Sequence, residues 1–252
     1  MCFRSAAVTR NCSPSLPSAS WGTRTGSIPG NLTLRALAHL AGEPARGAGE
    51  RRGLWFRYGV VCDQLSSTVL VLNVRAASPS PLSDLLASCA MHGVPVTLTL
   101  QQVHLWCRDA EWAHSGVLVC ENPSVMEKIA GALGPRAPPL VCVSGQMSIA
   151  ARLLLRSLID AGITVAYHGD FDWGGLEIGN QAIRLGAVPW RYGTGDYLAA
   201  ASSGKGGGEL QGRRVRAAWD PELAIAMEQT GRVVYEEAVL NALCADAGQD
   251  MP

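Results

Sequence analysis

One stretch of the sequence predicts both the fold and a site: Ala166-Tyr167-His168-Gly169-Asp170-Phe171-Asp172-Trp173-Gly174-Gly175. The apolar run that leads into it, 162–167, is typical of a buried strand, and the segment 176–185 after it is typical of a helix. Asp170 and Asp172 therefore lie where a strand ends and a helix begins. In an open α/β sheet, ligands bind at the carboxyl ends of the strands. Two carboxylates beside a glycine-opened helix N-terminus suit a hard divalent cation and a phosphate.

The alternation of strand and helix continues on both sides of this stretch. We expect strands at 117–120, 140–143 and 188–191 and helices at 125–133 and 147–161. Short connections between alternating strands and helices predict a mostly parallel sheet with helices on both faces. The expected fold class is therefore α/β, with residues 116–252 forming one domain that ends in helices.

The N-terminal half of the chain is less regular. Residues 1–30 are rich in Ser, Pro, Thr, Gly and Arg without periodicity, which is typical of disorder. Residues 31–115 predict a partial α+β region with helices at 31–40 and 82–91, a strand at 69–74 and an edge strand at 94–100, where Pro95 lies. After the central domain, we expect a flexible loop at 199–208 and helices at 220–227 and 231–243.

Composition limits the classes of function. The chain has 252 residues, of which 48% are hydrophobic and 17% charged, so it can bury a sizeable core. Its formal net charge of zero removes the simplest argument for nucleic-acid binding, although residues 1–60 contain eight arginines and only two acidic residues. The eight cysteines include no C-x-x-C pair, which argues against a zinc knuckle or a disulfide framework. Without an apolar run long enough for a membrane span, we expect a soluble, cytoplasmic protein with no membrane partner.

A third carboxylate completes the candidate site. Glu121 follows the strand at 117–120, and parallel strands bring their carboxyl ends to one edge, so Glu121 should meet Asp170 and Asp172. Oxygen ligands of this kind suit Mg²⁺ or Mn²⁺, which can polarise a phosphoryl oxygen and stabilise a leaving alkoxide. The alternative is that these acids cap turns and helices. Capping is the better interpretation for Glu121 alone, but two like charges as close as Asp170 and Asp172 repel unless a cation holds them.

Other side chains near these strand ends have weaker interpretations. His168 is expected to be a satisfied core residue, with metal ligand or general base as the alternative. Ser144 and Gln146 fit a contact to the substrate or to the metal ligands, and Cys120 and Cys142 fit buried free thiols. The cluster Arg213-Arg214-Val215-Arg216 is either a solvated surface or a contact to a DNA backbone.

The order Glu121, then Asp170-x-Asp172-x-Gly174, resembles the Toprim domain, a metal-binding fold shared by topoisomerases, primases and certain nucleases. Several longer segments resemble the JetD-like nuclease subunit of bacterial Wadjet plasmid-defence systems, whose Toprim domain is related to that of type IIB topoisomerase A subunits. These segments are 119–123, Ser144-Gly145-Gln146, 167–173 and Trp219-Asp220-Pro221. The resemblance extends from residue 116 to the end of the sequence and, more weakly, back to Asn31. Members of that family usually carry a longer N-terminal region.

The resemblance implies that Glu121, Asp170 and Asp172 are the catalytic acids and the ligands of Mg²⁺ or Mn²⁺. Glu236 or Glu237 would be accessory acids, although a solvated helix face explains them equally well. The implied activity is hydrolysis of phosphodiesters in plasmid DNA, presented by an SMC-type ATPase and accessory subunits. Homodimerisation is left open.

Three other functions are left open at this stage. A topoisomerase-like transesterase needs a nucleophilic tyrosine, and the tyrosines are Tyr58, Tyr167, Tyr192, Tyr197 and Tyr235. A catalytically degenerate subunit that binds DNA or partner proteins would be consistent with the short N-terminal region. A phosphatase with an aspartate nucleophile typically carries D-x-D after its first strand, with Thr or Val two residues on, where this chain has Gly174.

Overall fold

The computed structural model describes residues 64–107, 110–204 and 207–248. The described residues all belong to one compact unit, residues 63–252. The disorder expected at 1–30 and the helix expected at 31–40 lie outside the described residues.

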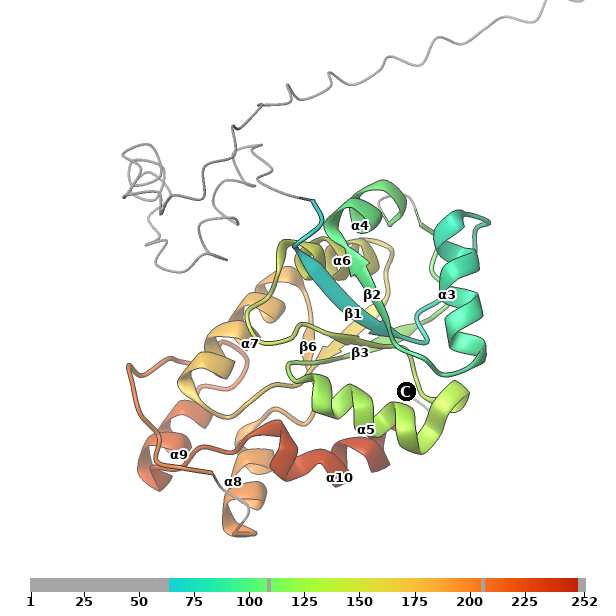
Figure 1. Cartoon of the computed structure of the whole chain (residues 1–252). Helices are drawn as coiled ribbons and strands as arrows, with labels where there is room; N and C mark the ends of the chain where they lie inside the picture. The colour runs from blue at the N-terminus through green and yellow to red at the C-terminus, as the bar shows by residue number, and fades with distance from the viewer. Residues whose placement is uncertain (1–63, 108–109, 205–206, 249–252) are drawn as a thin grey trace, which may run out of the picture. The chain divides into compact units, whose positions relative to one another are not determined.

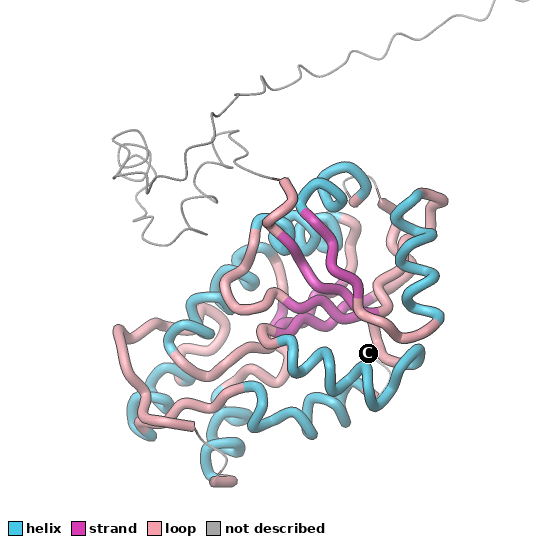
Figure 2. The backbone as a smooth tube through the Cα atoms, viewed as in Figure 1, coloured by secondary structure: helices cyan, strands magenta, loops and turns pink. Residues whose placement is uncertain are grey.

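Six strands of the described residues form one sheet in the order β2-β1-β4-β3-β5-β6, flanked by helices (Figures 1 and 2). The strands are β1 (Thr68–Leu72), β2 (Val96–Thr99), β3 (Gly116–Cys120), β4 (Leu140–Cys142), β5 (Thr164–Tyr167) and β6 (Val188–Pro189). The helices are α3 (Pro81–Met91), α4 (Leu100–Trp106), α5 (Pro123–Leu133), the 3₁₀ helix η1 (Gly134–Arg136), α6 (Ile149–Asp160), α7 (Trp173–Leu185), α8 (Thr194–Ser202), α9 (Leu223–Thr230) and α10 (Glu236–Ala247). The expected α/β class is confirmed.

The part of the sheet from β4 to β6 is parallel, as the alternation of strands and helices predicts. β3 pairs with β4 on one side and with β5 on the other, and β5 pairs with β6. Every residue of β3 is buried, because α5 and α10 pack on one face of the sheet while α6 and α7 pack on the other (Figure 1). A strand that is covered on both faces must be apolar throughout, which explains the uninterrupted hydrophobic runs of the sequence.

β1 and β2 extend the sheet beyond β4 with antiparallel pairing. β2 lies at the edge, in agreement with the prediction from Pro95 directly before it. Thr99 ends β2 and begins α4: its hydroxyl accepts a hydrogen bond from the Gln102 N–H at 3.3 Å, and the Gln102 side chain accepts one from the Thr99 N–H at 2.8 Å. This reciprocal capping box begins a helix that the hydrophobic pattern did not predict.

The predicted loop at 199–208 is wrong in its first part, because residues 199–202 belong to α8. The Asp196 carboxylate accepts a hydrogen bond from the Gly193 N–H at 3.0 Å and so begins the helix. Tyr197 fixes it to the core, since its ring is buried and its hydroxyl donates to the Arg232 carbonyl at 2.8 Å. The three alanines that follow are strong helix formers, so local propensity and packing agree.

The helix predicted at 231–243 begins later, at Glu236, because the residues before it are extended. Val234 pairs with Phe171 in an antiparallel bridge, in which the Phe171 N–H donates to the Val234 carbonyl at 2.8 Å. This bridge joins the segment before α10 to the loop after β5. It therefore brings the N-terminus of α10 to the carboxyl edge of the parallel strands.

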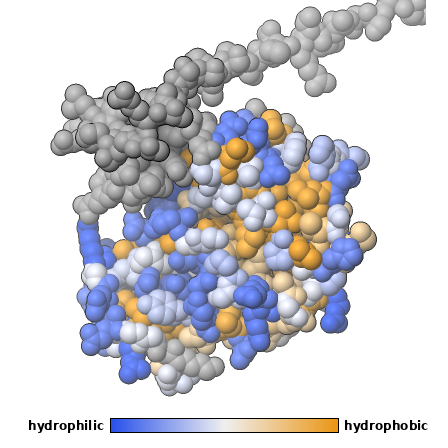
Figure 3. All heavy atoms as spheres, viewed as in Figure 1, coloured by the Kyte–Doolittle hydropathy of each residue, from blue (hydrophilic) through white to orange (hydrophobic). Residues whose placement is uncertain are grey.

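Hydrophobic side chains gather on the surface over α3 and the adjoining strands (Figure 3). Met91 and Val94, at the end of α3, expose 67% and 50% of their surfaces. The neighbouring Gly93 lies against Gly134, which comes before β4 in the chain, so this surface is at the amino edge of the parallel strands. None of the helices in the described residues combines the length and apolarity needed to cross a membrane.

Candidate functional site

The parallel pairing of β3 and β5 brings two of the predicted acids together. Glu121 directly follows β3, and Asp170 lies in the loop that follows β5. The Oε2 atom of Glu121 accepts a hydrogen bond from the backbone N–H of Asp170 at 3.2 Å. The Glu121 side chain is buried, with 8% of the residue exposed, so this carboxyl group is held inside the edge of the sheet rather than in solvent.

Both aspartates cap helices, and they cap different ones. Asp172 is the N-cap of α7, where its Oδ1 accepts from the Gly175 N–H at 2.6 Å. Asp170 caps the N-terminus of α10 from outside the helix: its Oδ1 accepts a hydrogen bond at 2.7 Å from the N–H of Glu236, the first residue of that helix. The capping alternative is therefore correct as a description of their contacts. It does not account for the burial of Glu121 beside them.

Glu236 is a functional candidate whose environment the sequence did not reveal. It is fully buried, so the interpretation as a solvated helix face is wrong for this residue. Its Oε1 accepts from the Glu121 N–H at 3.0 Å, and its Oε2 accepts from the Asn122 N–H. Glu237, one residue later, is exposed as expected and pairs with the Asn122 side chain. Two adjacent glutamates at a helix start give no local signal of which one turns inward, because only the bridge before α10 decides it.

Burial raises the pKa of three acids in this group, Glu121, Asp170 and Glu236. Burial and, to a lesser extent, the negative charges of Asp170 and Asp172 together raise the pKa of Glu121 from 4.5 to about 7, while the hydrogen bond from the Asp170 N–H opposes the rise. Burial also raises the pKa of Asp170 from 3.8 to about 6, together with the charges of Asp172 and Glu237, while the bond from Glu236 N–H opposes the rise. The pKa of Glu236 is raised well above its ordinary value, chiefly by burial. A cation placed among these groups would relieve the repulsion.

Aromatic side chains pack beneath the loop that carries Asp170. The Tyr192 hydroxyl donates to the Asp170 carbonyl at 2.6 Å, and its ring lies 5.0 Å from that of Phe171. His168 is 1% exposed and its Nδ1 lies 3.0 Å from the Trp190 carbonyl oxygen. Burial lowers the His168 pKa to about 4. The predicted core position is confirmed, but the prediction that the side chain is satisfied is wrong, because Nε2 is buried without a hydrogen-bond partner among the described residues.

Gly169 lies where no side chain fits. A Cβ at this position would be 2.7 Å from the Tyr167 hydroxyl oxygen and 2.9 Å from Oε2 of Glu121. The glycine therefore allows the loop to pass directly over Tyr167 and brings Asp170 up to the Glu121 carboxyl group.

The turn after β4 contributes backbone rather than side chains. The Gly145 N–H donates to the Glu121 carbonyl at 3.1 Å, whereas Ser144 and Gln146 are exposed. Cys120 and Cys142, at the ends of β3 and β4, are buried free thiols, as expected. The turn thus supports the backbone of Glu121 from the side opposite to Asp170, which lies beyond β3 in the strand order.

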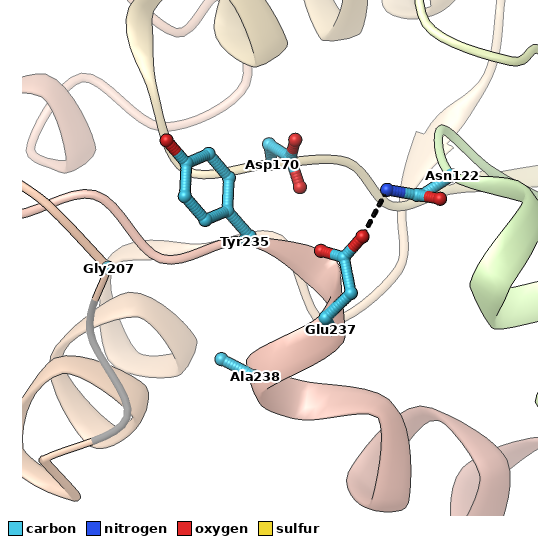
Figure 4. A pocket seen from close by; sticks show the side chains of 6 residues that line it. All are labelled: Asn122, Asp170, Gly207, Tyr235, Glu237 and Ala238. Atoms are coloured by element: carbon cyan, nitrogen blue, oxygen red, sulfur yellow. Dashed lines mark hydrogen bonds between the residues drawn. The ribbon is translucent and has the colours of Figure 1, made fainter.

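A pocket of ≈ 670 Å³ opens beside the acids, lined by Asn122, Asp170, Gly207, Tyr235, Glu237 and Ala238. Figure 4 shows Asp170 and Tyr235 on one side and the Asn122–Glu237 pair on the other. Tyr235 is 43% exposed, so the pocket has an accessible aromatic wall. Asp170 is the member of the acidic cluster that lines this pocket.

The donor chemistry of the cluster fits a divalent cation. Each carboxylate of Glu121, Asp170 and Asp172 accepts a hydrogen bond from a backbone N–H through one of its oxygens. Hard cations prefer such oxygens. As the described residues stand, however, no three His, Cys, Asp or Glu side chains lie close enough to form a metal-binding group. A cation would have to draw these carboxylates together.

Comparison with known families gives two matches. Residues 25–76 match a family described as protein of unknown function, N-terminus (DUF3323), and this match ends just beyond β1. Residues 96–247 match a family described as protein of unknown function, C-terminus (DUF2399), from the first residue of β2 to the last of α10. The search of curated proteins gave no match. Because the second of these matches covers more than half of the 252 residues, the chain belongs to the DUF2399 family.

Proposed function

We propose that this chain is a Mg²⁺- or Mn²⁺-dependent DNA endonuclease that hydrolyses phosphodiesters at Glu121, Asp170 and Asp172. One observation carries the proposal: Glu121 and Asp170 meet at the ends of β3 and β5, where burial and neighbouring carboxylates raise the pKa of both groups and no basic side chain is among the causes. Such an arrangement costs free energy in the folded protein, and a divalent cation is the simplest group that would offset the cost. The resemblance of these acids to the Toprim pattern supports the same conclusion.

The residues of the chain have separable tasks in this reaction. The three carboxylates would hold the cation, which when bound polarises the phosphoryl group and stabilises the leaving oxygen. The helices α5, α7 and α10 all begin at this edge of the sheet, with N-caps at Asn122, Asp172 and Tyr235. Their N-termini favour a phosphate group there. Asp170 lines the pocket, which gives the substrate an approach from solvent.

A basic segment near α7 supports DNA as the substrate. Gly212 packs against Trp173, which directly follows Asp172: a Cβ added at Gly212 would lie 3.7 Å from the Trp173 ring. Arg213 and Arg216, next along the chain, are exposed, whereas Arg214 pairs with Glu228 at 2.8 Å. Two exposed guanidinium groups would neutralise only a short length of phosphate backbone. We therefore also propose that partner proteins, by resemblance an SMC-type ATPase and its accessory subunits, present the DNA.

The test is cleavage of supercoiled plasmid in the presence of Mn²⁺, by the chain alone and with its SMC-type partners. The informative variant is Asp170→Asn/Asp172→Asn, because asparagine retains the helix caps and removes the charges. Asp160→Asn is the matched control, since Asp160 is an exposed acid at the end of α6. Metal-dependent nicking by wild type and control that is absent in the double variant supports the proposal. Absence of cleavage in the assembled complex overturns it and favours the degenerate subunit that binds DNA or proteins.

One observation keeps a topoisomerase-like transesterase as a second candidate. Tyr235 is 43% exposed and lines the pocket with Asp170, whereas Tyr167, Tyr192 and Tyr197 are fully buried. Tyr58 lies outside the described residues. A Tyr235 nucleophile would leave a covalent protein–DNA adduct that denaturing electrophoresis detects, and Tyr235→Phe would abolish it. Cleavage by Tyr235→Phe at the wild-type rate, without an adduct, would exclude this candidate.

A further inference from the structure

Glu236 is bound at three points to the two turns that carry the candidate ligands. Its two carboxylate oxygens accept from the backbone N–H groups of Glu121 and Asn122, in the turn after β3. Its own N–H donates to the Asp170 carboxylate, in the loop after β5. Within the described residues it is the carboxyl group buried most completely, with 0% exposed. One residue of α10 therefore joins the ends of two strands that lie far away in the sequence.

The helix that carries Glu236 is fixed at both ends. Leu243 and Ala247 are buried in the core cluster formed with α5, where Met126 and Ile129 lie. Near the far end of the helix, Asp246 binds Arg191 at 2.6 Å and also accepts from the Trp190 side chain. Because α10 is packed along its length, the position of the Glu236 carboxylate is determined by the core and not by the acids themselves.

We propose that Glu236 is a positioning residue that sets the separation between the Glu121 and Asp170 carboxylates and thereby the metal affinity of the site. The inference rests on the proposed metal-dependent function. Glu236 itself need not touch the cation, because its two oxygens are already engaged by backbone N–H groups. Residues that orient the ligands of a metal in this way change its affinity when they are replaced.

The two hydrogen bonds that the Glu236 carboxylate accepts from the Glu121 and Asn122 N–H groups, called the bracket below, explain why a glutamate is required. Two adjacent N–H donors need two acceptors, and a carboxylate supplies both. Glutamine supplies one oxygen, and its amide N–H₂ would face the second donor. One buried N–H would then be left without a partner, and the turn after β3 would be released at Glu121 or Asn122.

The experiment is a Mn²⁺ titration of the full chain, followed by electron paramagnetic resonance of the free ion. Glu236→Gln should weaken Mn²⁺ binding by about 10- to 100-fold. Asp160→Asn removes an exposed acidic group at the end of α6, away from both N–H groups, and should weaken binding by no more than about threefold. Leu243→Ala removes packing of α10 but keeps the bracket, so it should lower the unfolding temperature with less effect on Mn²⁺ affinity than Glu236→Gln has.

If Glu236→Gln does not fold, Glu236→Asp takes its place. Aspartate keeps both acceptors on a side chain one methylene shorter, so it reaches the two N–H groups poorly, and the same loss of affinity is expected. A folded Glu236 variant that binds Mn²⁺ as tightly as wild type overturns the proposal.

A second measurement separates this inference from the proposed function. If wild type binds no Mn²⁺, the metal-dependent function fails, and with it the link to affinity. The bracket is then judged by amide hydrogen exchange without metal. Glu236→Gln should accelerate exchange of the Glu121 or the Asn122 amide, whichever loses its acceptor, by about tenfold or more. Unchanged exchange at both amides would overturn the positioning role as well.

Discussion

The three neighbouring parallel strands β3, β4 and β5 end in turns that differ in the burial of their polar side chains. The turns after β3 and β5 place Glu121 and Asp170 in partly or fully buried positions, with their pKa values raised. The turn after β4 places Ser144 and Gln146 in solvent and contributes a backbone N–H. Topology alone makes the three turns equivalent, because all lie at the carboxyl edge.

The difference lies in what packs against each turn. Glu236 of α10 reaches the turns after β3 and β5. In the turn after β4, by contrast, the Gly145 N–H donates to the Glu121 carbonyl and the Ser144 hydroxyl lies 3.7 Å from the Cys142 sulfur. Acids that are buried without a neutralising partner reduce stability, and folds keep such groups mainly where they have a function. The comparison teaches that topology brings all three turns to the carboxyl edge, while contacts from a distant helix distinguish the two turns that carry buried acids from the one that does not.

The largest expected effect is on activity at the turn after β5. Asp172→Asn should lower plasmid cleavage by roughly 100-fold or more, comparable to removal of one charge-stabilising group from an active site. Asp172→Ala should lose as much activity and also about 1 kcal/mol of stability, because it removes the cap of α7. Cleavage kinetics and urea unfolding of both variants measure the two effects separately. Full activity of Asp172→Asn would show that Asp172 is only a cap.

The second effect is on the pH dependence of stability without metal. Because the folded pKa of Glu121 is raised from 4.5 to about 7, its neutral form is favoured by folding. The contribution of neutral Glu121 to the free energy of unfolding is fully present below pH 4.5 and is lost as the pH rises through about 7. Over this interval the free energy of unfolding of wild type should fall by on the order of 3 kcal/mol relative to that of Glu121→Gln. Urea unfolding at several pH values measures the difference. A constant difference between the two proteins would contradict the buried, unneutralised Glu121.

The same comparison becomes sharper with metal present. Mn²⁺ at about 100 times its dissociation constant should stabilise wild type by roughly 2.7 kcal/mol above neutral pH. Asp170→Asn/Asp172→Asn should show little of this gain. Equal stabilisation of both proteins would place the Mn²⁺ site elsewhere in the chain.

A third, smaller effect concerns the close approach at Gly169. Gly169→Ala should destabilise the fold by about 1–3 kcal/mol and move the Glu121 carboxyl group, because the new methyl group meets Glu121 and Tyr167 at less than 3.0 Å. The matched control is Gly131→Ala in α5, where nothing lies within 4 Å of the added Cβ. The control should be neutral or up to about 1 kcal/mol more stable. Similar unfolding free energies for the two variants would contradict the packing described for the β5 loop.

The smallest effect belongs to the turn after β4. Ser144 has φ of 55°, a left-handed conformation that glycine adopts without steric cost. Ser144→Gly should therefore stabilise the fold by up to about 1 kcal/mol, measured by thermal unfolding. A destabilised variant would mean that the Ser144 side chain makes a contribution that its exposed position does not suggest.

Much of the part of the fold that contains the parallel strands β3 to β6 could be predicted from sequence, because these strands are apolar runs and the helices between them follow polar capping residues. The strand before Glu121 and the strand before Asp170 were both predicted within two residues of their observed bounds. The close approach of Glu121 to Asp170 also follows from parallel topology. These features are local or depend on one general rule, so a single sequence contains enough information to predict them.

The features that were missed depend on contacts between distant segments. α4 and α8 begin at capping interactions inside weakly periodic sequence, where Gln102 and Asp196 provide the signal. The inward turn of Glu236 depends on the bridge between Val234 and Phe171, which no local pattern encodes. The sequence therefore predicts which acids lie at the ends of the strands, but not which contacts fix their positions.

Glu236 follows the other three acids in the sequence, and this order has a consequence for synthesis on the ribosome. Glu121, Asp170 and Asp172 all leave the ribosome before the residue that brackets their turns. A nascent chain that has not reached residue 236 lacks the hydrogen bonds between Glu236 and the two acidic turns, so these turns reach their final geometry only after residue 236 has left the ribosome. Amide exchange at Glu121 in a ribosome-arrested chain ending before residue 236 would detect this delay, and protection there already at the level of the full chain would contradict it.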